Sequence, residues 1–462
     1  MSDRPPAEPP TGPPAWEDLL RMLLGPNADE AIKMVRDSGI DLSAAADLPG
    51  GPEAIRAAMR QVQPFLAGAD DAPVSWSAVH DLARQTAAEG GDPVPGGAAT
   101  RQTVDALTTA DLWLDQVTGF DPAPGRRAAW SRAEWVEATL PAWRSLTEPI
   151  ASALTQALGT RLADTTDESL NQVVSSMAHQ VGQVLFGLQI GQAAGTLARE
   201  VFGTTDLGVP LVDPPVVALL PTDVAAFAEG LDTPAEEVLL FLAVREAAAA
   251  RLFAGAGWLR GWLTSAVDAY ARGITIDPEQ LDDLMRQIDP SDPASLRAAV
   301  TEGLFEPRTT PAQDAALVRL ETALALVEGW VDEVSAAAVA DHLPDAVALR
   351  EMMRRRRAAG GPAEHTFATL VGLQLRPRRL RDAARLWAAV AADSSQTERD
   401  AVWHHPDLMP GPDDLDDPDG YPARRRAAAQ GTDDLDQALA DILSPDGPAA
   451  EPPVEPPAGP SR

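Results

Sequence analysis

The sequence predicts a mainly α-helical protein with disordered ends, and three observations support this fold class. Hydrophobic residues make up 45% of the 462 residues but aromatic residues only 5%, so Ala, Val and Leu must fill most of the core. Ala and Leu lose little conformational freedom in a helix. Apolar residues recur at helical spacing along most of the chain, and Pro, Asp, Gly and Ala crowd both ends.

Both ends are expected to be disordered, because neither can bury enough apolar surface to offset the entropy of ordering. At the N-terminus this concerns residues 1–14, which are rich in Pro. At the C-terminus it concerns residues 409–462, an acidic tail rich in Pro and Asp. Within the tail, Leu435 and Leu439 lie on one helical face behind Thr432, a possible N-cap. This spacing predicts one short amphipathic helix in the tail.

Between these ends, residues 15–90 are expected to form an N-terminal helical extension, with helices near 16–22 and 52–65. A joint rich in Gly and Pro at residues 90–97 separates the extension from the main body, residues 91–408.

The main body continues the helical pattern. A helix is predicted over Ser131–Leu146, where Ser131 and Glu134 have the spacing of a capping box. Gly187, Gly191 and Gly195 then recur every four residues beside an apolar stripe, which lets another helix approach closely. The stretch 207–220 is interrupted by Gly and Pro, and it is the best place for a short β hairpin.

A further helix is predicted over residues 234–253, with Thr233 as its cap. Glu246 lies on its apolar face together with Leu239 and Leu242. A carboxylate in that position is either paired with a basic neighbour or takes part in chemistry. The residues alone favour a salt bridge.

Four long segments of the body resemble a bacterial family of zincin-like metallopeptidases. Members of this family carry labels such as hydrolase, zinc-dependent metalloprotease or deazaflavin-coenzyme biosynthesis-associated protein. The similarity extends from about Val74 to Leu408. The segments that carry it are WSRAEWVEATLPAW (130–143), FGLQIGQAAGTLAREVFGTTDLGVPL (186–211), REAAAARLFAGAGWLR (245–260) and LVEGWVDEV (326–334).

The resemblance implies a zincin-like helical body and, for the family, a zinc ion held by an H-E-x-x-H helix. In that motif two His residues four apart bind the metal, and the Glu between them activates a bound water. The matching window here is Arg245 to Ala249, so Glu246 keeps the general-base position while Arg245 and Ala249 occupy the two ligand positions. The relatives' third ligand, from an E-G-H motif, corresponds to Trp330, which follows Glu328.

These substitutions predict that zinc is absent, and we expect no other cofactor. Ala249 and Trp330 lack a donor atom, and the fixed cation of Arg245 repels a dication. We expect Arg245 to form a buried ion pair with Glu246 or Glu328. The function expected is that of a catalytically inactive pseudo-metallopeptidase with a cytoplasmic binding or scaffold role for a protein partner.

The alternative is an active zinc-dependent hydrolase that recruits replacement ligands. The residues available for that purpose are Glu246, Glu328, Asp332 and His179. A role in coenzyme biosynthesis is a third possibility, which depends only on the label that some relatives carry.

Charge and composition exclude several other classes. The net charge of -32 opposes binding to nucleic acid and to anionic membranes, and the absence of Cys excludes disulfides and thiolate metal sites. No apolar run reaches the roughly 18 residues of a membrane span, and the first residues do not form a signal peptide, so a cytoplasmic location is expected.

Two basic clusters, 354–357 and 376–381, are interpreted as helix surface that pairs with the many acidic residues. The alternative interpretation of these clusters is a docking patch for an acidic partner or an anionic ligand. The adjacent His404 and His405 do not share a helical face, so they are not expected to bind a metal.

Overall fold

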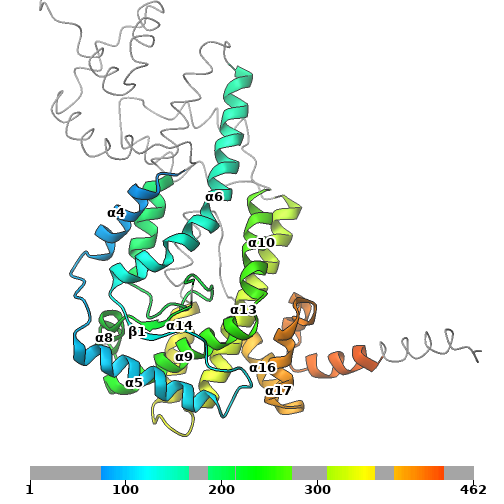
Figure 1. The fold of residues 1–462 in the computed structure, drawn as a ribbon. Helices are drawn as coiled ribbons and strands as arrows, with labels where there is room; N and C mark the ends of the chain where they lie inside the picture. The colour runs from blue at the N-terminus through cyan, green and yellow to red at the C-terminus, as the bar shows by residue number, and fades with distance from the viewer. Residues whose placement is uncertain (1–73, 166–185, 214, 273–309, 359–378, 431–462) are drawn as a thin grey trace, which may run out of the picture.

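The computed structural model describes residues 74–165, 186–213, 215–272, 310–358 and 379–430, and these residues are mainly α-helical (Figure 1). The predicted fold class is therefore confirmed. None of the helices in these ranges is long and apolar enough to cross a membrane.

The longest fully described helix, α13 (Pro311–Val339), forms the centre of the molecule. A capping box fixes its start, since Thr310 Oγ1 accepts a hydrogen bond from the Gln313 amide and the Gln313 side chain accepts one from the Thr310 amide. Residues 323–332 are buried in an unbroken run. A helix that is buried on every side must be surrounded by others. Here the surrounding helices are α9 (Ala235–Gly255), α10 (Leu259–Ala271) and α16 (Leu380–Asp393).

Helix α9 packs against α13 on one side and against α5 (Gly97–Leu114) and α8 (Pro221–Glu229) on others. The fully buried Arg251 fastens α9 to α5, because its guanidinium donates to the side chains of Asp111 and Asp115 and to the carbonyl of Phe120. The expected cap at Thr233 is not formed, since α9 begins at Ala235 with Pro234 in the cap position and no side-chain hydrogen bond.

Helix α4 (Trp76–Ala87) packs on α6 (Arg132–Thr165) and on the helical residues 186–198, although it was expected in the N-terminal extension. The glycine repeat makes this close approach possible. A Cβ atom at Gly195 would lie 2.5 Å from Thr86 Cβ, closer than real atoms come. The packing role predicted for the repeat is confirmed. The capping box at Ser131 and Glu134 is also present, with both hydrogen bonds formed.

Besides an isolated antiparallel bridge between Gly203 and Leu219, the β structure in the described ranges is a pair of three-residue strands, β1 (Arg127–Ala129) and β2 (Val217–Leu219). They run parallel, with Ala128 opposite Ala218. The prediction placed a strand correctly in the stretch 207–220, but a hairpin there is wrong, because β2 pairs with β1 instead. Pro210 and Pro215 lack the amide hydrogen that a second strand of the ladder needs, so this stretch supplies one strand only.

The chain continues through α14 (Ala346–Ala358) and, after α16, through α17 (Gln396–Ala401), two short 3₁₀ turns (Val402–His404 and Pro406–Leu408) and α18 (Pro412–Asp416). Residues 421–430 are also helical. Residues 411–430 were expected within the disordered tail, and this expectation is wrong because Leu415 and Tyr421 are buried. The helix predicted behind Thr432, the expected helices at 16–22 and 52–65, and the N-terminal residues 1–14 lie outside the described residues.

Candidate functional site

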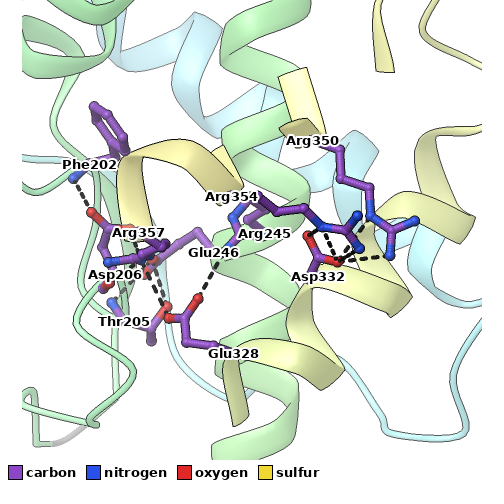
Figure 2. A network of polar contacts seen from close by, with 10 residues as sticks. All are labelled: Phe202, Thr205, Asp206, Arg245, Glu246, Glu328, Asp332, Arg350, Arg354 and Arg357. Carbon is purple, nitrogen blue, oxygen red and sulfur yellow. Dashed lines mark hydrogen bonds and ion pairs between the residues drawn. The ribbon is translucent and has the colours of Figure 1, made fainter. Parts of the chain in front are cut away.

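A small pocket forms where α9, α13, α14 and the loop 202–206 meet (Figure 2). Arg245 and Ala249, one turn apart, line it from one face of α9, and Glu246 lines it from the neighbouring position. Glu328 comes from α13, and Arg357 from the end of α14. The loop side contributes Thr205 and Asp206, among others.

The guanidinium of Arg245 contacts Glu328, with Nη2 3.1 Å from Oε2. Both side chains are 8% exposed, so the pair is almost fully withdrawn from water. Of the two carboxylates considered as partners for Arg245, Glu328 is the one that it contacts. A buried charge without such a partner would be costly.

Glu328 also faces a second guanidinium. Arg357 Nη2 lies 3.4 Å from Glu328 Oε1 and 2.6 Å from Asp206 Oδ1, and it donates to the Asp206 carbonyl. Burial would lower the pKa of Arg357, but Glu328 and Asp206 outweigh this effect and raise it. The result is an alternating cluster, Arg245–Glu328–Arg357–Asp206, in which every charge has an opposite neighbour.

Glu246 points the other way, toward the loop. Its Oε1 accepts hydrogen bonds from the amide and the hydroxyl of Thr204, and its Oε2 accepts from the amide and the hydroxyl of Thr205. A carboxylate has about four lone-pair sites, so these donors use them all. The approach is so close that a Cβ atom at Gly203 would lie 2.4 Å from Glu246 Oε2. Burial raises the pKa of Glu246 to about 7, although the hydrogen bonds from Thr204 and Thr205 oppose the rise.

Asp332, one turn after Glu328 on α13, is held by two other arginines. Arg350 Nη2 and Arg354 Nη2 donate to its Oδ2 at 2.8 and 2.7 Å. Burial raises the pKa of this carboxyl, but the hydrogen bonds from Arg350 and Arg354 outweigh it and leave the pKa below its usual range. The arginines of the 354–357 cluster are therefore not simply solvated: Arg354 and Arg357 bind buried carboxylates.

Trp330 lies outside this pocket. Its fully buried indole donates from Nε1 to Asp400 Oδ1 at 2.9 Å, and Arg399 lies over its ring. The structure thus brings Arg245 and Ala249 together with Glu328, while Trp330 faces the C-terminal part of the chain. This follows from helix geometry, because two residues of separation turn a side chain by more than half a circle.

The donors present do not fit a zinc ion. Residue 245 presents a cation, residue 249 a methyl group, and Glu328 is already paired with two guanidinium groups. The space left in the pocket is about 20 Å³ for the centre of a water-sized sphere, which is room for about one water. Across the described ranges, no three His, Cys, Asp or Glu residues lie where they could hold a metal ion together. His179 lies outside those ranges.

Sequence reasoning missed the loop side of the site. Thr204, Thr205 and Asp206 have no motif of their own, and the pairing of Arg357 with Asp206 joins residues 151 positions apart. The basic cluster 354–357 was the one feature of the sequence that indicated charged contacts here. The sequence did not show which arginines of this cluster would be buried and which exposed.

Comparison with known proteins identifies a family and a fold. Residues 74–421 match the family described as zincin-like metallopeptidase. A crystal structure entitled a putative hydrolase with a novel fold, from Chloroflexus aurantiacus, is similar with a TM-score of 0.54 and 19% identity. That similarity covers 76% of this chain and 99% of the other, and at this identity it shows the shared fold alone. No curated protein matches the sequence.

Proposed function

The chain belongs to the zincin-like metallopeptidase family, and we propose that it is a non-catalytic member in which a buried ion-pair cluster stands where relatives hold zinc. The observation that carries this proposal is the contact between Arg245 and Glu328. A guanidinium stays protonated at any pH a folded protein meets, so its charge cannot be removed to admit a dication.

The state of Glu246 supports the same proposal. A general base in a zincin must accept a proton from a water that the metal has acidified. In the ionised form of Glu246 both carboxylate oxygens accept hydrogen bonds from Thr204 and Thr205, and no lone pair is left for a water. Glu246 therefore acts as an anchor for the loop 202–206 rather than as a base.

The rival function, a hydrolase with replacement ligands, finds less support. Glu328 is held by Arg245 and Arg357, and Asp332 by Arg350 and Arg354. Recruiting either carboxylate to a metal would leave buried arginines without a partner, which is costly.

The role that remains is binding. We propose that the protein acts in the cytoplasm as a binding or scaffold protein for a protein partner. Its net charge of -32 opposes association with nucleic acid or an anionic membrane, because both carry negative charge themselves.

Metal analysis of untagged protein, purified without chelators, tests the proposal. We expect zinc far below one equivalent per chain, no increase after incubation with zinc followed by desalting, and no cleavage of a mixed peptide library. One tightly held zinc per chain, together with peptide cleavage that Glu246→Gln abolishes, would refute it.

A further inference from the structure

A second cavity lies on another face of the molecule, bordered by α5, α8 and the first turns of α9. Its volume is about 710 Å³, within the roughly 300–1,000 Å³ typical of ligand-binding clefts. Figure 1 shows α5 and α8 near one another at the lower left, where α9 begins. None of the residues that line this groove lines the Arg245 pocket.

The groove has a mixed lining, in which small Ala and Thr side chains alternate with polar Gln102 and Asp105 on α5, while α8 and α9 contribute mainly apolar side chains. On α5 it is lined by Ala99, Thr103, Ala106 and other residues that recur at helical spacing as far as Thr109, so the groove follows one face of α5 for about three turns, or about 15 Å. Ala225 and Ala228 line it from α8, and Leu239 and Leu240 from α9. The small side chains of Ala99, Thr103, Ala106 and Thr109 leave room for another helix to lie close against this face of α5.

The charged residues in the lining are acidic. Asp105 and Glu236 are both exposed, and neither has a basic partner within the part of the chain that the structure describes. Glu229 and Asp232, at the end of α8 and just beyond it, are exposed as well. Arg101 precedes Asp105 by one turn of α5 but does not line the groove.

We propose that this groove binds a basic amphipathic helix of a partner protein. Leu or Met side chains of the partner would pack on lining residues that keep exposed apolar surface, among them Ala99, Ala225, Leu239 and Leu240. Its Lys or Arg side chains would pair with Asp105 and Glu236. Laying the apolar face of a helix into a groove is a common mode of peptide recognition, and opposite charges at the rim set its orientation and partner choice.

This inference deepens the binding role proposed above, but the two can fail separately. The groove shares no lining residue with the Arg245 pocket, so loss of helix binding leaves the argument about zinc untouched, and a zinc ion at residue 245 would leave the groove unchanged.

The test uses full-length protein and a fluorescein-labelled synthetic helix with Leu on one face and Lys on the other. A matched peptide carries Glu in place of Lys. Fluorescence anisotropy at moderate salt measures both affinities. We expect the Lys peptide to bind and the Glu peptide to bind at least about tenfold more weakly, since every charge pair is reversed.

Two variants then locate the binding surface. Ala225→Trp fills the groove at an exposed position, and the double change Asp105→Lys, Glu236→Lys reverses its charge. Each should weaken binding of the Lys peptide about tenfold or more. The control, Asp407→Lys with Asp413→Lys, makes the same change in net charge at exposed sites of the C-terminal part and should leave the affinity within about twofold. Circular dichroism confirms that each variant is folded, and the charge-reversed variant keeps the test valid if Ala225→Trp disturbs packing.

Three results would overturn the proposal. The first is no binding of the Lys peptide to the wild-type chain. The second is equal binding by the groove variants and the control, which would show attraction to an acidic protein in general. The third is a wild-type dimer, seen by analytical ultracentrifugation, that Ala225→Trp converts to a monomer, because the occupant would then be a second copy of the chain.

Discussion

Arg245 and Glu328 form the contact on which the chemistry of the site depends. The guanidinium supplies positive charge in the pocket, and Glu328 neutralises it across the space between α9 and α13. Removing one member of a buried pair leaves the other charged and desolvated.

Arg245→Ala is therefore expected to destabilise the protein by about 3 kcal/mol, the low end for a broken buried pair, because Arg357 still contacts Glu328. The control is Arg355→Ala, since Arg355 is 71% exposed and pairs only with Glu351 on its own helix. Arg356 would be a poor control, because it stacks on Phe202 and Phe227. Urea unfolding measures both changes, and equal losses for the two variants would contradict the prediction.

The raised pKa of Glu246 leads us to expect that the stability of the folded protein depends on pH. Burial raises this pKa to about 7 in the folded protein, from an ordinary value of 4.5. Between these two values the folded chain holds a proton that the unfolded chain has released, so stability falls as the pH rises through this window. The fall attributable to Glu246 is at most about 3 kcal/mol.

The hydrogen bonds of Thr204 give a geometric reason why the Glu246 carboxyl keeps its proton. The Thr204 hydroxyl lies in contact with Glu246 Oε1 and 2.9 Å from the Val216 carbonyl, but it has a single hydrogen to donate. When Glu246 is protonated it donates to Thr204, and Thr204 can then donate to Val216. We expect Glu246→Gln to remove the fall in unfolding free energy between about pH 5 and about pH 7. Parallel pH profiles for the two proteins would show that Glu246 is ionised throughout.

The placement of Trp330 alters how a metal site could be rebuilt. Because Trp330 faces Asp400 and Glu328 faces Arg245, the double variant Arg245→His, Ala249→His supplies two imidazoles beside a carboxylate, a His₂Glu set that zinc accepts. Competition with a chromophoric chelator should show zinc binding by this variant and none by the wild type. Adding Trp330→His should give no further affinity, and a requirement for it would mean that α13 is rotated relative to this structure.

At the scale of elements, local signals predicted what depends on local sequence. The capping box at Ser131, the helix that contains Glu246 and the glycine repeat at 187–195 were predicted because caps and helical spacing lie within a few residues. The pairing of β1 with β2 could not be predicted, because three residues show no alternation and the strands are 90 positions apart. The expectation of disorder was wrong for residues 411–430, because burial of Leu415 depends on packing that composition does not encode.

The glycine repeat provides a test of helix packing. Gly195→Ala should destabilise the protein by about 1–3 kcal/mol, although Ala favours helix, because the new methyl group meets Thr86 and the Ala83 carbonyl. Gly261→Ala on α10 has open space around it and should instead stabilise by about 0.5–1 kcal/mol. Thermal unfolding compares the two, and a stabilising Gly195→Ala would mean that α4 is not in close contact.

The C-terminal elements can be tested by truncation. Deleting residues 431–462 should leave the melting temperature nearly unchanged, as the composition of the tail suggests. Deleting residues 411–462 should lower it by about 5 °C or more, because Leu415 and Tyr421 leave the core with α18 and the helix that follows. Equal melting temperatures would show that the packing of α18 on α16 adds nothing.

At the scale of the whole molecule, the hydrophobic core is formed mainly by residues that do not line the Arg245 pocket. Buried Trp135, Trp143, Trp387 and Trp403 and the apolar faces of α9, α10, α13 and α16 form the core, and the Arg245 pocket is a small polar inclusion within it. The charged residues of this pocket could therefore be exchanged without rebuilding any helix, which is how one fold can serve different functions.

Asp400 binds parts of the chain that the ribosome synthesises at widely separated times. Its carboxylate accepts hydrogen bonds from Thr118 and Gly119 near the start of the described chain and from Trp330 in α13. Thr118 and Asp400 are 282 positions apart, and at about 5–20 residues per second a ribosome needs roughly 14–56 s to cover that length. During that interval Thr118, and later Trp330, is already part of the nascent chain, but the Asp400 carboxylate that accepts its hydrogen bond in the folded protein has not yet been made. The hydrogen bonds from Thr118, Gly119 and Trp330 to Asp400 can therefore form only after residue 400 has left the ribosome, so this part of the packing around α13 is completed after the helices that it joins have been made.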